Sequence, residues 1–509
     1  MVPAALPQRR FGFTSARSDG CNSPAGGGNT PVTAVSECRL GAEASVIEKV
    51  KSMLTPEQAY QALGQDGAAA LFGGGGEPEE RALRLRSLLF NGAVRPDAAA
   101  VVACRDVEAV QAAVRLAAEH RMPVAVVGGG HDISGRGLVK DNLVLDLRSM
   151  KQIEYDEGFQ HVTIGTGVLA SELLQSLPAD RAVIVGGCLS VGIVGFTLGG
   201  GYGPLTAGFG LSCDALVEAS IVLADGSFVL ASEGVNPDLF WAVRGGGGGF
   251  GVVTSIKLAT HSLPDVLSSA IVVPLEHAKD ALIAVQEAID QEPVHLSIFS
   301  AFVVGPEGRP VLFASALWTG PRSSGIELLD ALVRATGGVE VKRQSQPFKE
   351  TFDPQAEAAW PKGDNYHLIT RNVSRLTDRV IDILVEGARE LPTPKDFLLV
   401  HDFHGAATRV AADATAFPLR DDHFMIEITG HWAAAEPDGG DDSRRWAEDL
   451  SRRLLPVELP GGYPALLAPH EADRVREFYG SSAERLSALK LRVDPQDMFR
   501  SAAGRIEMT

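Results

Sequence analysis

Three glycine-rich blocks constrain the fold of this chain more than any other feature. They occupy residues 128–130, 186–203 and 245–249, and glycine accounts for 55 of the 509 residues, against a usual share of about 7%. The first block directly follows Val124 to Val127, an apolar run typical of a strand. Glycine lets backbone amides approach a ligand closely, and successive N–H groups form concavities that bind anions. The pattern predicts loops that hold the pyrophosphate of a dinucleotide.

Composition and charge exclude several classes of protein. Hydrophobic residues make up 45% of the chain and charged residues 22%, which is typical of folded globular proteins, and the length predicts two or more domains. The net charge of −18 argues against nucleic acid as a partner, because it would repel phosphate backbones. Five scattered cysteines without a C-x-x-C pair indicate reduced thiols and no metal site. We expect a cytoplasmic protein without a membrane span, since the chain lacks a long apolar run and an apolar segment after Arg9-Arg10.

Five segments differ in composition along the chain. Residues 1–45 are rich in Gly, Ser, Pro and Ala and are expected to form a mobile tail. Residues 46–90 are expected to contain a helix at Val46 to Leu63 and a flexible linker at Gly73 to Gly76. Residues 91–264 are expected to form a dinucleotide-binding region, and residues 265–465 a substrate-binding region of helices and alternating strands. Residues 466–509 are expected to form a C-terminal segment that returns to the dinucleotide-binding region.

The region from residue 91 to 264 has an α/β pattern. Ala98 to Cys104 and Val124 to Val127 are predicted strands, and Asp106 is predicted to cap the helix between them. A hairpin is predicted at Ala224-Asp225-Gly226, which separates two short apolar runs. This region is therefore expected to begin with a β-α-β unit.

Two strands can be predicted in the region from residue 265 to 465, at 398–404 and 423–432. Their alternation favours an antiparallel sheet with one apolar face covered by helices and one polar face. Residues 471–500 are expected to form a helix followed by a short terminal element. The alternation places Val400, Asp402 and His404 on one face of the first strand, and His423, Glu427 and His431 opposite Phe424, Ile426 and Ile428 on the second.

Two familiar nucleotide motifs match incompletely. Gly165 to Ala170 fits the nicotinamide-dinucleotide pattern G-x-G-x-x-A, but no acidic residue follows about 20 positions later. Gly245 to Gly249 lacks the Lys-Ser/Thr ending of a phosphate-binding Walker loop. Neither a nicotinamide nor a nucleoside-triphosphate site is predicted.

The glycine blocks carry a family resemblance that covers about 400 residues. G-G-G-H-D at 128–132, G-G-C-x-x-V-G-x-x-G-x-x-L-G-G-G-x-G at 186–203, R-G-G-G-G-x-F-G-V-V-T at 244–254 and an F-Y-G…D-P…F ending at 478–499 stand in this order. The chain thereby resembles the berberine-bridge-enzyme-like oxidases of the vanillyl-alcohol-oxidase superfamily. The resemblance implies an α+β fold with a two-subdomain PCMH-type FAD-binding domain and a substrate domain in which helices cover an antiparallel sheet.

By the same resemblance, FAD is bound covalently at two residues. His131 would bond the 8α-methyl carbon of the flavin (8α-histidyl), and Cys188 would bond C6 (6-S-cysteinyl). An imidazole nitrogen and a thiolate are both nucleophiles suited to an electron-poor ring. The alternatives are a loop histidine that caps the backbone and a small buried cysteine. The other positions that the resemblance assigns to the cofactor are Val127, Gly128, Gly129, Gly130, Asp132, Ser134, Gly187, Val191, Gly192, Gly195, Thr197, Gly199, Gly200, Gly203, Gly251 and Val253; for the glycines the alternative is a tight turn.

The chain departs from the family at positions that affect the chemistry. Val127 and Gly249 stand where relatives often have Arg and Asn, and Ser482-Ala483 replaces an Asn-Tyr pair whose Tyr often serves as the catalytic base. A base must lie within hydrogen-bond reach of the substrate proton. Glu427 is the first candidate, with the solvated face of a sheet as the alternative reading for the histidines. The further candidates are His404, His431, Tyr202 and Tyr366.

The resemblance implies a two-electron oxidase. It would oxidise a CH–OH, CH–NH or phenolic group of a bulky secondary metabolite or sugar-containing substrate, with O2 as acceptor and H2O2 as product. A flavin-dependent dehydrogenase or an oxidative or redox-neutral cyclase is the alternative, and a non-enzymatic flavin-binding relic is the third hypothesis. Partners are expected to be a small-molecule substrate and O2, in a monomer or homodimer.

Overall fold

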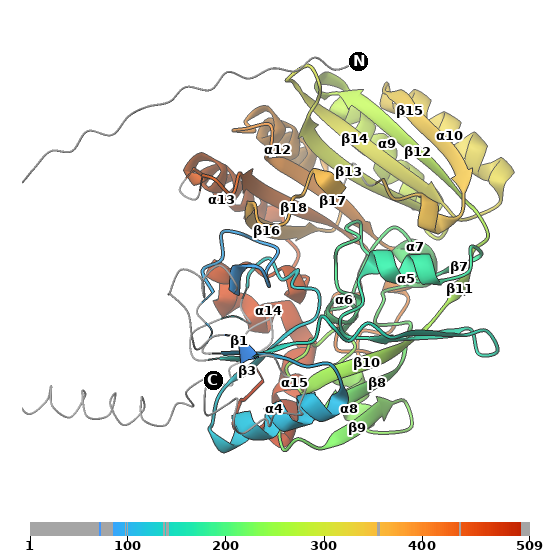
Figure 1. Cartoon of the computed structure of the whole chain (residues 1–509). Coiled ribbons are helices and arrows are strands. Elements are labelled where there is room, and N and C mark those ends of the chain that lie inside the picture. The colour runs from blue at the N-terminus through green and yellow to red at the C-terminus, as the bar shows by residue number, and fades with distance from the viewer. Residues whose placement is uncertain are drawn as a thin grey trace, which may run out of the picture. The chain divides into compact units, whose positions relative to one another are not determined.

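The computed structural model describes residues 71–72, 85–96, 98, 100–135, 138, 142–353, 357–436 and 439–499 (Figure 1). All of them belong to one compact unit that begins at Leu54. The tail predicted at residues 1–45, the helix predicted at Val46 to Leu63 and the linker predicted at Gly73 to Gly76 lie outside the described residues. The fold is α+β, as predicted.

The first sheet carries the first glycine loop. Its described strands run in the order β1-β2-β4-β3, in which β2 and β3 both pair parallel to β4. Helix α4 begins after Asp106, whose side chain accepts a hydrogen bond from the Ala109 amide at 2.8 Å, so the predicted cap is confirmed. The bounds are Leu71–Phe72 for β1, Ala100–Ala103 for β2, Val107–Glu119 for α4, Val124–Val127 for β3 and Leu143–Asp146 for β4.

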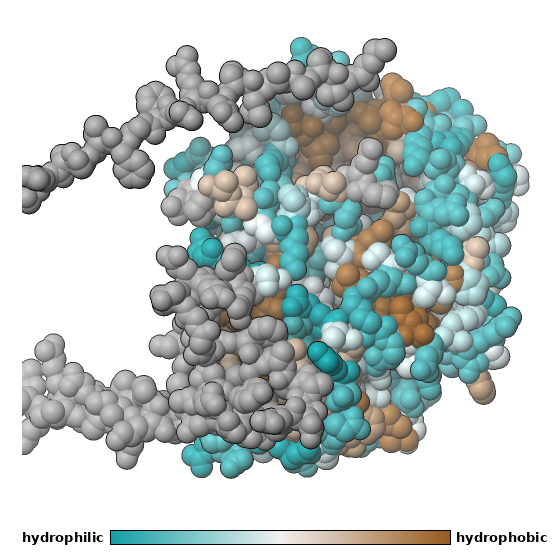
Figure 2. All heavy atoms as spheres, in the orientation of Figure 1, coloured by the Kyte–Doolittle hydropathy of each residue, from teal (hydrophilic) through white to brown (hydrophobic). Residues whose placement is uncertain are grey.

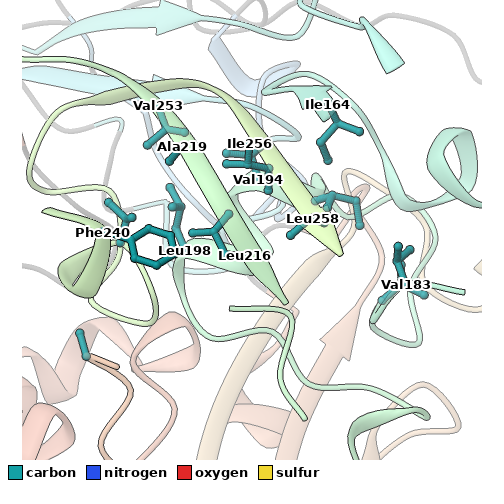
Figure 3. Packing of buried hydrophobic residues seen from close by; sticks show 14 of the residues in the cluster. Ile164, Val183, Val194, Leu198, Leu216, Ala219, Phe240, Val253, Ile256 and Leu258 are labelled. Atoms are coloured by element: carbon teal, nitrogen blue, oxygen red, sulfur yellow. The ribbon is translucent and has the colours of Figure 1, made fainter. Parts of the chain in front are cut away.

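The second sheet is antiparallel, in the order β5-β6-β10-β8-β9, and its core packs against the second glycine block. Figure 3 shows Val194 and Leu198 among side chains of these strands, including Ile164 and Val253. The hairpin predicted around Asp225-Gly226 joins β8 to β9. The bounds are Ile153–Asp156 (β5), His161–Gly165 (β6), Ala170–Ser176 (α5), Ile193–Leu198 (α6), Thr206–Phe209 (α7), Leu216–Val222 (β8), Phe228–Ser232 (β9), Pro237–Ala242 (α8) and Val252–Ala259 (β10), with the pair β7 (Arg181–Ala182) and β11 (His261–Ser262) beside it.

The third sheet is the antiparallel sheet predicted for the substrate region. Its described strands follow the order β15-β12-β14-β13-β17-β18-β16, and helices lie on one of its faces (Figure 1). The bounds are Val266–Pro274 (β12), Ala278–Gln291 (α9), Leu296–Val304 (β13), Pro310–Trp318 (β14), Arg322–Thr336 (α10), Val339–Gln346 (β15), Asn365–Val373 (β16), Asp378–Arg389 (α12), Phe397–Phe403 (β17), His423–Trp432 (β18) and Asp441–Leu454 (α13).

The two faces of this sheet differ. The helix-covered face buries Phe424, Ile426 and Ile428, which confirms the alternation predicted for β18. We call the other side the open face; it carries Glu427 and His431. The open face was expected to be polar throughout, but near β13 and β14 it is apolar, because Phe299, Val303 and Phe313 lie there, partly exposed.

The C-terminal segment returns to the first two sheets. Phe499 forms a parallel bridge with Val124 of β3, and the Val124 amide donates to the Met498 carbonyl at 2.7 Å. Within residues 471–500, one helix followed by a short terminal element was predicted. The single helix is wrong: α14 (Val475–Tyr479) and α15 (Ala483–Val493) are separate, because the chain turns at Gly480 with a φ of 46°. Short 3-10 helices at Pro464–Leu466, Pro469–Arg474 and Gly480–Ser482 complete the segment.

Candidate functional site

Two glycine loops meet backbone to backbone at the centre of the candidate site. A Cβ placed on Gly129 would lie 2.5 Å from the Gly192 nitrogen, and one placed on Gly192 would lie 2.7 Å from the Gly129 nitrogen. Gly130 follows with a φ of 74°, a conformation that favours glycine. Gly128 is packed against the Thr166 carbonyl, at 2.8 Å from a Cβ. Only glycine therefore permits this contact between the loops.

Two other glycines face open space. No described heavy atom lies within 4 Å of a Cβ placed on Gly187 or on Gly195. Gly187 precedes Cys188, and Gly195 lies in α6. A cofactor could lie against both residues without displacing any described part of the chain, so this stretch fits a flat ring or a phosphate chain.

The remaining positions assigned to the cofactor are mostly engaged within the protein. Thr197 is fully buried and shares a 2.7 Å hydrogen bond with Ser212, and the Ser134 hydroxyl donates to the Leu467 carbonyl at 3.0 Å. Asp132 accepts from the Ser134 amide at 3.1 Å. A Cβ would be crowded or contacted by neighbouring protein atoms at Gly199, Gly200, Gly203 and Gly251. Val127 and Val253 are buried. The Val191 amide donates a hydrogen bond to the Cys188 carbonyl.

The two proposed anchors lie side by side. The sulfur of Cys188 is 3.3 Å from Nε2 of His131, although the residues are 57 positions apart in the sequence. The His131 ring stacks on Phe90, with 4.0 Å between ring centroids. Burial lowers the pKa of His131 to about 4, so its imidazole is neutral near pH 7 and keeps a free lone pair. Burial, with the charge of Glu357, raises the pKa of Cys188 to about 11.

Glu357, which the sequence did not single out, holds the loop around Cys188. Its carboxylate accepts from the amides of Leu189 at 2.8 Å and Ser190 at 3.0 Å, and from the Cys188 thiol at 3.4 Å. Burial acts to raise the pKa of Glu357, but these hydrogen bonds outweigh it and keep the pKa below its usual value. The Glu357 carboxylate therefore fixes the position of the Cys188 thiol by accepting its hydrogen bond.

A second group of side chains surrounds Glu427 on the open face. Glu427 is 6% exposed, and its carboxylate accepts from the Thr429 hydroxyl at 3.3 Å and lies 3.5 Å from Nε2 of His401. The Tyr202 ring meets His401 edge-on, with 5.1 Å between ring centroids, and meets Tyr463 at 5.0 Å. Burial, followed by the nearby charge of Glu427, raises the pKa of Tyr202 well above its usual value.

Several buried polar atoms beside Glu427 have no hydrogen-bond partner among the described residues. They are the Thr370 hydroxyl, both polar atoms of the Asn372 side chain and Nε2 of His401. Thr370 stands directly opposite Glu427 in the register of β16 and β18. Buried polar groups are nearly always hydrogen-bonded in native proteins, so these atoms indicate the position of a ligand.

The five predicted candidates for the base do not all gather at one place. Glu427 and Tyr202 lie in the group just described. Tyr366 and His431 stack on each other with 4.6 Å between centroids, and Phe90 links Tyr366 to His131. The Tyr366 hydroxyl donates to the Pro361 carbonyl, and Nε2 of His431 lies 2.9 Å from Asp364.

His404 lies apart from Glu427. It follows the end of β17, where its Nε2 contacts the Leu296 carbonyl at 3.1 Å and its Nδ1 lies 3.4 Å from Asp402. Val400, predicted to share its face, belongs to the helix-covered core. At the position of the usual tyrosine, Ala483 is buried in the core of the second sheet, so α15 supplies no polar group there.

Comparisons with known proteins identify the class. The FAD binding domain model matches residues 98–232, and the berberine and berberine-like model matches residues 456–504. The FAD-linked oxidoreductase fogF of Aspergillus ruber is 32% identical over 439 residues, covering 81% of this chain and 86% of that protein. The FAD-linked oxidoreductase OXR1 of Pyricularia oryzae is 30% identical over 416 residues, covering 77% and 80%.

A solved structure shares the fold. The glucooligosaccharide oxidase of Acremonium strictum, described as carrying 6-S-cysteinyl, 8α-N1-histidyl FAD, superposes with a TM-score of 0.75 at 23% identity, covering 86% of this chain and 96% of that one. The chain belongs to the berberine-like family of FAD-linked oxidoreductases, and FAD is its cofactor. No helix among the described residues is long and apolar enough to cross a membrane.

Proposed function

We propose that this chain is an oxidase that carries FAD attached at two residues, through the 8α-methyl carbon to His131 and through C6 to Cys188. The main support is that the His131 nitrogen and the Cys188 sulfur lie 3.3 Å apart, while Gly187 and Gly195 face open space. A doubly attached flavin in a protein of the same fold supports the proposal. The neutral imidazole supplies a lone pair, and Glu357 holds the Cys188 thiol in place by accepting its hydrogen bond.

The substrate is proposed to be a bulky molecule with an oxidisable CH–OH, CH–NH or phenolic group. Bound FAD supplies the chemistry of accepting two electrons as a hydride and passing them to O2, which becomes H2O2. Glu427 takes the proton of the reacting group, because it is the carboxylate that stands beside the unpartnered polar atoms of the open face. The Thr429 hydroxyl holds that carboxylate in place by donating a hydrogen bond, and His401 lies beside it.

The test of attachment follows the yellow colour after acid precipitation. Wild type, His131→Ala, Cys188→Ala and the double variant are compared by spectra of the refolded or proteolysed pellet. We expect colour in the wild-type and single-variant pellets and none in the double-variant pellet. Colour released from the wild type would contradict double attachment, and a colourless preparation would favour a non-enzymatic relic.

The test of oxidase activity follows H2O2 and the flavin together. An alcohol substrate added in air is expected to release H2O2 while the flavin stays oxidised, because O2 reoxidises it rapidly. Flavin that becomes reduced and stays reduced in air would instead assign a dehydrogenase or a cyclase to the same site.

A further inference from the structure

We propose that the substrate of this enzyme has an apolar, aromatic body that lies on the open face along β13, β14 and β17, with only its reacting end polar. This rests on the proposed function, since it extends outward from the position of Glu427. It assigns a chemical class to the substrate: an aryl-bearing alcohol or amine with few hydroxyl groups, in contrast to an oligosaccharide.

The register of the sheet connects Glu427 to an apolar surface. Leu399 stands opposite Glu427, Ala301 stands opposite Leu399, and Phe313 stands opposite Ala301. Paired residues share a face, so this row runs along the open face from the carboxylate across β17 and β13 to β14. A molecule whose reacting group lies at Glu427 can extend over these strands without leaving the face.

The surface around this row is apolar; Phe299, Val303, Phe313 and Trp360 are partly exposed, and Ala301, Phe397 and Leu399 are buried beneath them. We define the apolar strip as Phe299, Val303, Phe313, Trp360, Phe397 and Leu399, which pack together around Ala301. The rings of Trp360 and Phe397 lie 4.1 Å apart, and Phe299 lies 5.2 Å from His401, which ties the strip to the polar group. Figure 2 shows a brown, hollowed area where Figure 1 draws β13 and β14.

Polar atoms are found near Glu427 and are nearly absent from the apolar strip. The Thr370 hydroxyl and the Asn372 amide stand on β16, and the His401 nitrogen stands on β17 beside Glu427 of β18; none of the three has a hydrogen-bond partner among the described residues. None of the six side chains of the apolar strip carries a charge, and only the Trp360 indole has a hydrogen-bond donor. A sugar hydroxyl placed on the strip would lose its hydrogen bonds to water, whereas an aromatic ring would gain contacts there.

The experiment measures binding and turnover of three probes: benzyl alcohol, biphenyl-4-methanol and cellobiose. Binding is read from the change in the flavin absorbance spectrum under anaerobic conditions in the catalytically impaired Glu427→Gln variant, and turnover from H2O2 release by the wild type. Biphenyl-4-methanol is expected to bind at least about tenfold more tightly than benzyl alcohol, since its second ring reaches the strip. Cellobiose is expected to leave the spectrum unchanged.

Variants locate the effect. Phe313→Ser is expected to weaken binding of biphenyl-4-methanol about tenfold and to leave benzyl alcohol unchanged, because only the longer probe extends to β14. Phe228→Ser is the control, since Phe228 is 44% exposed on β9, outside the third sheet. Equal weakening of both alcohols by Phe313→Ser would indicate a structural effect and overturn the proposal.

Other results also overturn it. Binding and oxidation of cellobiose, or the absence of binding by biphenyl-4-methanol, would exclude the aromatic class. A dimer that dissociates on Phe313→Ser would assign the strip to contact between two copies of the chain. Failure of the proposed oxidase function can be distinguished from failure of this proposal. If the enzyme is not an oxidase, no H2O2 is released, but the flavin spectrum still changes when biphenyl-4-methanol binds.

Discussion

The glycine loops around His131 and Cys188 and the open face around Glu427 differ in which atoms of the chain face the site. The loops present backbone: Gly129 and Gly192 approach each other to distances that exclude any side chain. The open face presents side chains fixed by strand register, with Leu399 and Thr370 on either side of Glu427. A cofactor common to a whole family can be held by backbone, whereas the substrate of one enzyme has to be selected by side chains.

The largest effect is expected from a methyl group placed between the two glycine loops, where Gly129 meets Gly192. Gly129→Ala should abolish flavin incorporation, because its methyl carbon would stand 2.5 Å from the Gly192 nitrogen and force the loops apart. The measurement is the ratio of flavin absorbance to protein in the purified variant.

Gly195→Ala is the matched control for that variant. Its methyl group enters open space and replaces a helical glycine, so we expect unchanged or slightly higher stability, by up to about 1 kcal/mol. Flavin incorporation should fall nevertheless, because the methyl group occupies the space that we assign to the cofactor. Normal flavin content in Gly195→Ala would place the cofactor elsewhere.

The next effect concerns the open face. Glu427→Gln should slow reduction of the flavin by biphenyl-4-methanol by about 10²- to 10⁴-fold, because the base is lost while shape is kept. Flavin content should stay at the wild-type level. Stopped-flow absorbance in the absence of O2 gives the rate, and Thr429→Val, which removes one hydrogen bond to the carboxylate, should slow it far less. Equal rates in Glu427→Gln and wild type would exclude Glu427 as the base.

A third effect concerns how the C-terminal segment is attached to the substrate sheet. Arg371 of β16 is buried and contacts Glu471 at 2.8 Å, with Glu458 and Arg474 completing the group. Arg371→Met should lower the free energy of unfolding by about 3 kcal/mol, since the buried carboxylates of Glu471 and Glu458 lose one of their two arginine partners and then share Arg474. Arg375→Met, at the exposed pair with Asp290, should cost less than about 1 kcal/mol. Urea unfolding compares them, and similar losses would contradict this assignment.

The smallest effect is a pH dependence at the edge of the open face. Burial lowers the pKa of His423 to about 4, below the value of about 6.5 in an unfolded chain. Between these values the unfolded state binds the proton and the folded state does not, so stability present above pH 6.5 is lost as the pH falls toward 4, by up to about 1.4 kcal/mol per pH unit.

The variant His423→Phe keeps the stack on Phe403, which has 4.3 Å between ring centroids, and removes the titrating group. Urea unfolding at pH 7 and pH 5 should show a smaller difference in this variant than in the wild type. An unchanged difference would mean that His423 does not contribute.

Features that depend on residue type at short range could be predicted from the sequence. The cap at Asp106, the hairpin at Asp225-Gly226 and the two faces of β18 each follow from neighbours a few positions apart. The glycine loops could be predicted for the same reason, because the need for glycine is local. What the loops bind came from the family resemblance.

Features that depend on tertiary contact could not be predicted. Glu357 meets Cys188 across 169 positions, and nothing around Glu357 in the sequence marks it as special. His401 was overlooked because the alternation of its strand was read from Val400, which faces the helices. The apolar strip was missed because β13 and β14 were not predicted as strands. The row from Glu427 to Phe313 can be recognised only from the register of these strands.

The return of the C-terminal segment to the first two sheets affects the order of folding during synthesis on the ribosome. Phe478 and Leu486 fill the core beneath the second glycine block, and Met498 and Phe499 close the sheet from which the first glycine loop emerges. These residues are synthesised after the entire substrate region. We therefore expect the third sheet to assemble while the first two sheets still lack part of their core, and FAD to be captured only after residue 499 has been synthesised.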